Sequence, residues 1–264
     1  DSVASRGLGD VYKRQAFREG GYIVKNLKFF FMTLVLACTF SIPVSADDIT
    51  ADILTYDGIS KVATAEGNVV IHANQGAVIT GQKGQYYFGD RSAWLEGNVR
   101  YEKDETVMTA DKLYIYNDKT VHGTGSVYLN DRAEGRVLKG DDVTYNADTG
   151  IGKIRGDGYL EFSDASMQAP LIEGNLKQVE VVASGGVNLT SNSRQMTGYS
   201  DMATYTRSGI NGNDGKLVLT GNAHIVQNGN SFDGPELVIW DADKIIETTG
   251  RSTLVITNTS SGSK

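Results

Sequence analysis

One phrase recurs along this chain from residue 49 onward. Its first half is of the type apolar-Thr-Ala/Gly-Asp-x-apolar-x-aromatic. Its second half, which follows a short turn, is of the type Leu-x-Gly-Asn-Val-x-apolar. The clearest copies of the two halves are 49–56, 108–115 and 138–145, and then 66–69, 96–99 and 220–223. Repetition at a fixed period is the signature of a fold built from repeated supersecondary units. The repeat therefore constrains the architecture before any single residue is interpreted, and it points away from catalysis.

Apolar and polar residues alternate with a period of two throughout the repeats. The alternating stretches are rich in Val, Ile, Tyr and Thr, and Gly, Asn and Asp separate them. No window has apolar residues at the i, i+3, i+4, i+7 spacing of a helix, so the pattern predicts an all-β chain. The chain divides into seven strand-turn-strand units, at roughly 49–78, 79–107, 108–137, 138–168, 169–195, 196–231 and 232–258.

Two architectures are compatible with such units. Turns of the Asn-Asp type, such as 116–119, favour an antiparallel twisted β-jelly-roll built from about seven two-strand repeats. A parallel β-helix, which needs no tight hairpins, is the alternative. The fifth unit is degenerate, and the sixth carries extra residues around 208–215.

Every second residue of each predicted strand is apolar, and the residues between them are mostly polar. This alternation predicts strands with one buried face. This apolar stripe is the feature with functional potential. It either packs as an ordinary closed core or opens along one side as a groove that holds acyl chains between two sheets. The predicted groove residues are Leu54, Tyr56, Val69, Ile71, Tyr86, Phe88, Val99, Tyr101, Leu113, Ile115, Val127, Leu129, Val143, Tyr145, Leu160, Phe162, Val187, Leu189, Tyr205, Ile225, Leu237 and Ile239.

A sheet built by repetition leaves an unpaired strand at each end, here 49–56 and 253–258. Unpaired edge strands invite pairing with another chain, and neither edge has a proline to block it. The pattern predicts head-to-tail pairing, and flanking residues that cover the edges are the alternative. The predicted edge residues are Ile49, Ala51, Ile53, Thr253, Val255 and Thr257.

The first residues do not resemble part of the fold. Residues 1–23 have the character of a non-native or upstream read-through segment, and 24–46 that of a signal peptide. The signal peptide has Lys25 and Lys28, then an apolar stretch, then Val44-Ser45-Ala46 as a small-x-small cleavage site. This predicts an exported chain, and the resemblance described below implies that its destination is the periplasm. The alternatives are a lipoprotein through Cys38 and an uncleaved anchor, although the stretch is shorter than the roughly 20 residues that span a bilayer. A disordered tail is expected at 259–264.

Cysteine content and charge exclude several classes of function. The single cysteine, Cys38, lies in the predicted leader, so a mature chain has no disulfide, thiol nucleophile or cysteine metal site. Removing residues 1–46 takes away six basic and three acidic residues, which moves the net charge from -7 to about -10. An acidic exported chain is a poor candidate for nucleic acid, whose binding depends on Lys and Arg.

Residues that could carry chemistry are scattered or repeated. The three histidines, at 72, 122 and 224, show no metal-site spacing. Asp52, Asp111 and Asp141 recur at one place in successive units, whereas a catalytic pair would occur once. We interpret these aspartates as hydrogen-bonding residues at strand entries, and the Gly-Asn pairs as turn-to-strand junctions. No catalytic residue, metal or cofactor is predicted, so the chain is not expected to be an enzyme.

The repeats resemble a known family. The segments 109–113, 138–141 and 219–223, arranged as exported two-strand repeats, are similar to the periplasmic lipopolysaccharide-transport bridge proteins of the OstA/LptA-like family. The resemblance covers nearly all of the predicted domain, 47–258. It implies a twisted β-jelly-roll whose inward residues carry lipopolysaccharide by its acyl chains.

The resemblance also implies partners. It implies head-to-tail self-association and contacts at both edges with other lipopolysaccharide-transport proteins of the same fold, which join the inner membrane to the outer membrane. This chain is longer than compact family members, so another component with the same fold is an alternative to the bridge itself. Two further alternatives come from other classes, an exported structural scaffold or adhesin without lipid and a β-helical carbohydrate enzyme.

Overall fold

The computed structural model describes residues 46–73, 76–133, 135–162, 165–176, 178, 180–208, 214–240 and 245–257. The predicted segment 1–23, the signal peptide up to residue 45 with Cys38, and the tail 259–264 lie outside the described residues. Most of the extra residues predicted in the sixth unit, 209–213, also lie outside them.

The described chain consists of β-strands joined by short turns. None of its described residues forms a helix long and apolar enough to cross a membrane. The strands are β1 Ala46–Thr50, β2 Ile53–Asp57, β3 Val62–Ala73, β4 Ala77–Tyr87, β5 Ser92–Lys103, β6 Thr106–Ile115, β7 Thr120–Asp131, β8 Arg136–Asn146, β9 Ile151–Phe162, β10 Ala165–Asn175, β11 Glu180–Ser191, β12 Met196–Ser208, β13 Asp214–Gln227, β14 Asn230–Trp240, β15 Ile246–Thr249 and β16 Thr253–Val255.

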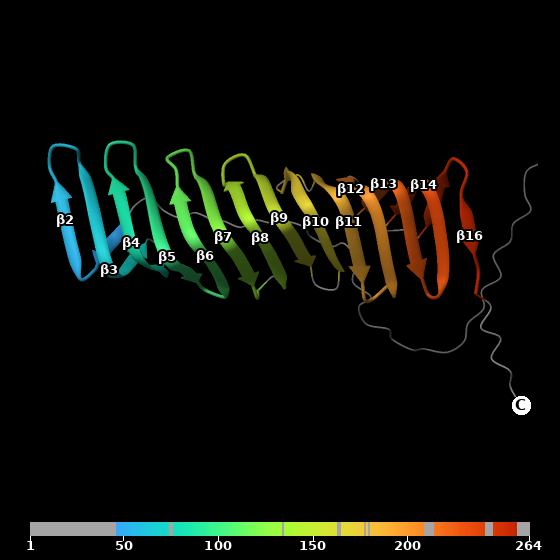
Figure 1. The fold of residues 1–264 in the computed structure, drawn as a ribbon, viewed down its shortest axis with the longest axis horizontal. Coiled ribbons are helices and arrows are strands. Elements are labelled where there is room, and N and C mark those ends of the chain that lie inside the picture. Colours follow the sequence, from blue (N-terminus) through green and yellow to red (C-terminus); the bar gives the residue numbers. More distant parts are fainter. Residues whose placement is uncertain are drawn as a thin grey trace, which may run out of the picture.

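All the described strands belong to one 16-stranded sheet. Strands β3 to β14 pair in sequence order, β1 and β2 both pair with β3, and β15 and β16 both pair with β14. The strands therefore follow one another along the long axis, with β2 near one end and β16 at the other (Figure 1). Every pairing is antiparallel, which confirms the predicted jelly-roll of seven two-strand units and excludes the parallel β-helix.

Each long strand is interrupted near its middle by a β-bulge, which we call its corner. At β6–β7 the pairing passes from Thr109↔Tyr128 to Lys112↔Thr124, so the bulge sets Gly125 and Ser126 against Asp111. Two residues against one is the geometry of a bulge that bends a sheet. The same count recurs at the other strand junctions, including those at the two ends.

The local sequence explains the corner. Gly125 and Ser126 have φ of 74° and 49°, in the left-handed region that Gly adopts without steric cost. The carboxylate of Asp111 packs directly against Gly125 and leaves no space for a Cβ there. In the first unit, Asn68 Nδ2 donates a hydrogen bond of 2.9 Å to Asp52 Oδ2. The repeated phrase therefore encodes a bend that its own side chains stabilise.

This geometry corrects two interpretations of the sequence. Asp111 and Asp141 lie at mid-strand corners within β6 and β8, not at strand entries. The Gly-Asn pairs likewise lie inside strands, at the corners of β3, β5 and β13, and are not turn-to-strand junctions. The prediction failed because residues that tolerate positive φ are typical of turns, and here they serve a bulge in a continuous strand.

The corners divide the sheet into two layers. Layer 1 holds the strand halves next to the connection inside each unit, such as β2–β3 and β4–β5. Layer 2 holds the halves next to the connections between units, such as β3–β4 and β5–β6. Apolar side chains of both layers form one buried cluster along the molecule.

Candidate functional site

Direct cross-strand pairing aligns the interior side chains in rows that run the length of the sheet. Three of these rows are mostly apolar, two in layer 1 and one in layer 2. Row A is Leu54, Ala65, Gly84, Leu95, Leu113, Gly123, Val143, Ile154, Ile172, Ala183, Ala203, Leu219, Leu237 and Thr248. Row B is Tyr56, Ala63, Tyr86, Ala93, Ile115, Val121, Tyr145, Gly152, Gly174, Val181, Tyr205, Leu217, Ile239 and Ile246. Row C, in layer 2, is Ile49, Ile71, Ile79, Tyr101, Met108, Leu129, Leu138, Leu160, Met167, Leu189, Gly198, Ile225, Phe232 and Leu254.

Most of the predicted groove residues lie in this interior. The buried ones are Val69, Val99, Tyr101, Leu113, Ile115, Val127, Leu129, Tyr145, Leu160, Val187, Leu189, Tyr205, Ile225, Leu237 and Ile239. Ile71, Tyr86 and Val143 are half-buried. The exposed ones are Leu54, Tyr56 and Phe88, which lie at or near the N-terminal edge. The side chain of Phe162 is outside the described part of the structure.

Sequence reasoning missed more than half of the buried apolar residues. Met108 and Leu138 are interior residues on the first strand of their units. The single corner residue in such a strand shifts the alternation of inward and outward side chains by one position, so the pattern on one side of the corner does not continue on the other. Leu95 and Val121 are interior residues on the second strand of their units, before the Gly corner. The sequence pattern had indicated that the strand starts at this corner, so the residues before it were not included. The sequence did contain a signal for the bend: a Gly-Asn pair recurs in the second strands and a single Asp recurs in the first strands. This signal could have extended the alternation pattern of both strands across the bend.

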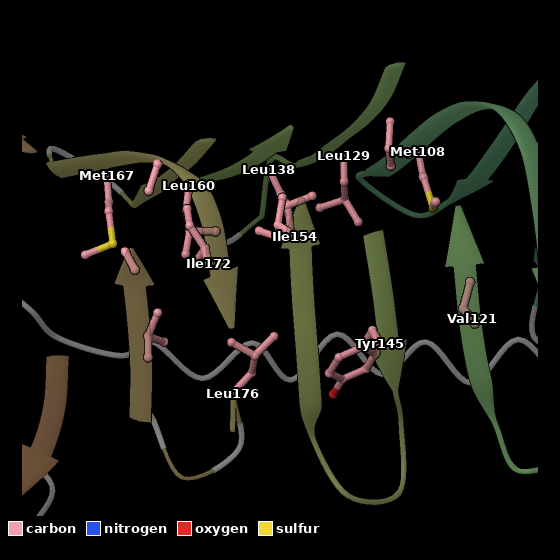
Figure 2. Packing of buried hydrophobic residues seen from close by; sticks show 14 of the residues in the cluster. Met108, Val121, Leu129, Leu138, Tyr145, Ile154, Leu160, Met167, Ile172 and Leu176 are labelled. Carbon is pink, nitrogen blue, oxygen red and sulfur yellow. The ribbon is translucent and has the colours of Figure 1, made fainter. Parts of the chain in front are cut away.

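Two apolar pockets lie in this interior. One lies between β7, β8, β9 and β10, where Leu129 and Leu138 of layer 2 face Tyr145 and Leu176 of layer 1. In Figure 2, Leu129 and Leu138 lie on one side of this interior and Tyr145 and Leu176 on the other, with Ile154 between them. The space between the atoms is about 650 Å³, part of which opens to solvent. The walls offer apolar surface almost exclusively, so the pocket can hold hydrocarbon but offers few partners to a polar ligand.

The second pocket lies at the N-terminal end, inside β2 to β6. Ala63, Ala65, Ile71, Ile79 and Leu95 contribute to its lining, around about 630 Å³ of space, part of which is open solvent. Ile115 also lines this pocket and pairs directly with Val121, which lines the first pocket. The two pockets are therefore neighbours along the same interior.

An aromatic cluster borders the N-terminal pocket. The ring of Phe88 meets those of Tyr56 and Tyr86 edge-to-face, with centroid distances of 5.6 Å and 4.7 Å. Tyr56 is 61% exposed and Phe88 is 49% exposed. Large aromatic side chains exposed beside an apolar pocket form a natural entrance for an apolar ligand.

The outer surface differs sharply from the interior. In layer 1, Lys83 pairs with Glu66 at 2.7 Å, and Lys112 pairs with Glu96 at 3.2 Å. The hydrogen bond from Lys83 to Glu66 raises the pKa of the Lys83 ammonium. Hydrogen bonds to Tyr114 and then to Glu96 raise the pKa of Lys112. Both lysines stay charged at neutral pH, so the outer surface of layer 1 carries charge while its inward rows A and B are mostly apolar.

The three histidines lie on this outer surface, each beside an aspartate. His72, His122 and His224 each contact one aspartate, at 2.5, 2.8 and 2.6 Å. Among the residues that the structure describes, no three His, Cys, Asp or Glu side chains are grouped so as to hold a metal ion.

Comparison with known proteins gives the family. Residues 78–245 match the family model described as "LptA/(LptD N-terminal domain) LPS transport protein". One similar solved structure is LptH of Pseudomonas aeruginosa, described as the LptA homologous periplasmic component of the conserved lipopolysaccharide transport device. It is 18% identical, with a TM-score of 0.41, and the match covers 48% of this chain and 99% of that chain. No curated protein matches the sequence. Since the family model spans more than half of the chain, this protein belongs to the LptA/(LptD N-terminal domain) family of LPS transport proteins, a transport family and not a family of enzymes.

Proposed function

We propose that this protein carries lipopolysaccharide across the periplasm, with the acyl chains between layers 1 and 2. The observation that carries the proposal is the pair of neighbouring apolar pockets in a chain of an LPS transport family. Burial of hydrocarbon contributes about 0.8 kcal/mol per methylene, so ten methylenes would contribute about 8 kcal/mol. Sugars and phosphates would remain in solvent outside the layers.

The acidic net charge, -7 for the whole sequence and about -10 without residues 1–46, does not oppose this cargo strongly. Repulsion between an acidic surface and an anionic headgroup is screened beyond roughly 8 Å at physiological salt. The burial of acyl chains is therefore the larger effect. Periplasmic location is supported by the predicted signal peptide and by membership of the LPS transport family.

We propose further that copies assemble head to tail through the two edges of the sheet. At the N-terminal edge, Ile53 and Leu54 are 59% and 53% exposed. At the C-terminal edge, Leu254 and Val255 are 53% and 52% exposed. Apolar side chains on unpaired strands favour the addition of a further strand. The same edges would serve other transport proteins with this fold.

Site-specific photocrosslinking tests the cargo. A photoreactive residue at Ile71, which is half-buried and lines the N-terminal pocket, should crosslink to lipopolysaccharide. The matched control is Val70, the adjacent residue on β3, whose side chain points to the outer face. The proposal predicts a strong lipid adduct at 71 and little at 70. Equal crosslinking at both positions, or none at 71 in a folded protein, would contradict it and favour a structural scaffold without lipid.

A further inference from the structure

The two ends of the sheet carry complementary halves of one corner. Between consecutive units, the second strand always contributes two corner residues and the first strand of the next unit contributes one, as where Gly67 and Asn68 lie against Gln82. The C-terminal end has such a pair, Gly250 and Arg251, between β15 and β16. The N-terminal end has such a single residue, Asp52, between β1 and β2.

We infer that a second copy of this chain joins in one register, which sets Gly250 and Arg251 of the first copy against Asp52 of the second. The inference rests on the proposed head-to-tail assembly and adds the partner's alignment to it. In this register Thr249 pairs with Ile53 of the second copy, and Thr253 pairs with its Thr50. The junction then has the same two-against-one count as the junctions between units within one chain.

The interior rows select the same register independently. Row B ends at Ile246 and would continue into Tyr56 of the second copy. Row C ends at Leu254 and would continue into Ile49 of the second copy. A slip of one residue would turn every interior side chain of the added edge towards solvent. The apolar interior of two copies is therefore continuous in this alignment.

A slip of two residues keeps the faces but loses the corner. The Gly250 and Arg251 pair, with φ of 80° at Gly250, would then meet a regular strand residue of the second copy. The two layers of the second copy would no longer bend where those of the first do. Only the proposed register satisfies both the parity of the rows and the position of the bend.

An ion pair between the two copies would favour the same register, but it would contribute less to the free energy of association. Neighbouring strands lie about 4.8 Å apart, so the guanidinium of Arg251 comes within reach of the Asp52 carboxylate of the second copy. Exposed ion pairs contribute little, and replacing Arg251 by Ala should weaken association about two- to fivefold. High salt should remove most of that difference, since exposed pairs are screened.

Cysteine pairing between two differently tagged full-length chains tests the register, both in a Cys38→Ser background. One chain carries Thr55→Cys and the other carries Glu247→Cys, on outward positions that the register places directly opposite. Paired residues in antiparallel strands have Cα atoms about 4.5–5.5 Å apart, within the range of a disulfide. The matched control replaces Glu247→Cys by Thr249→Cys, which a two-residue shift along the strand, about 7 Å, takes out of range.

The outcomes separate the register from the assembly. Preferential disulfide formation by the 55–247 pair, at least tenfold above the 55–249 pair, is the expected result. Equal yields, or a preference for the 55–249 pair, in chains that associate by sedimentation would overturn the register and leave head-to-tail assembly intact. Chains that stay monomeric in sedimentation, with no disulfide from either pair, would overturn the assembly itself.

Discussion

Row A changes character between the two ends of the molecule. At the N-terminal end it holds Ala65 and Gly84, and at the C-terminal end it holds Leu219 and Leu237. Both leucines are fully buried, whereas Ala65 and Gly84 line the N-terminal pocket. The backbone pairing is the same in both places, so at these four positions the two ends differ in the size of the inward side chain.

Row B repeats the contrast. Ala63 and Ala93 occupy β3 and β5 at the N-terminal end, and Leu217 and Ile239 occupy β13 and β14 at the C-terminal end. The leucine and isoleucine are 2% and 0% exposed. A repeat fold can therefore leave space between its layers over part of its length and pack closely over another part without any change in strand geometry.

The largest effect should come from deleting side-chain volume at the filled end. Leu219→Ala is expected to lower the free energy of unfolding by about 2–5 kcal/mol, because it removes buried methyl groups and leaves a cavity. Leu54→Ala, in the same row but 53% exposed at the other end, should cost much less. Urea denaturation followed by circular dichroism measures both, and equal losses would contradict the contrast between the ends.

Corner substitutions should act alike at both ends. Gly67→Ala and Gly221→Ala each place a Cβ against an aspartate, Asp52 or Asp201, and on a backbone with φ near 77°. Each is expected to cost about 1–3 kcal/mol through strain in the left-handed region. The measurement is thermal or urea unfolding of each variant. A large difference between them would mean that the ends differ in their bends as well as in their interiors.

Enlarging an inward side chain should destabilise the protein more at the C-terminal end than at the N-terminal end. Ala203→Leu, at a fully buried position in row A, should destabilise the protein by about 1–3 kcal/mol through overpacking. Ala65→Leu should cost less, because the pocket accepts the added methyl groups, and it should reduce lipid crosslinking at Ile71. Val70→Leu, on the outer face of the same strand, is the control for both readouts. Unchanged crosslinking in Ala65→Leu would show that the pocket does not hold the acyl chain.

The smallest effect belongs to the outer surface. Lys112→Met removes the ion pair to Glu96 and should cost no more than about 1 kcal/mol. The folded protein raises the pKa of Lys112, so its contribution is present below the unfolded value of about 10.4 and is lost as pH rises through the folded value. Denaturation of wild type and variant at pH 7 and above pH 11 should show a difference that shrinks at high pH.

Much of the fold was predictable from local patterns. Period-two alternation and turn residues gave the antiparallel all-β architecture and its seven units, which the structure confirms. The corners escaped prediction because Gly67, Asn68 and Asp52 interact across a strand pair, and neither segment reveals the contact alone. The interior residues Met108 and Leu95 were missed for the same reason. Each lies in the same strand as a predicted inward stretch but on the other side of the corner, where the alternation was thought to have ended.

The sequence by itself determined the strands, the inward face on one side of each corner and the residue types that permit each bend, because these depend on neighbours along the chain. Only the tertiary structure decided where the interior keeps its space and how the edges end. The pocket beside Ala65 exists because side chains from strands of both layers meet there and leave a volume unfilled. That volume depends on segments that are distant in sequence and that only folding brings together. The proposed match between Gly250 at one edge and Asp52 at the other depends on folding in the same way.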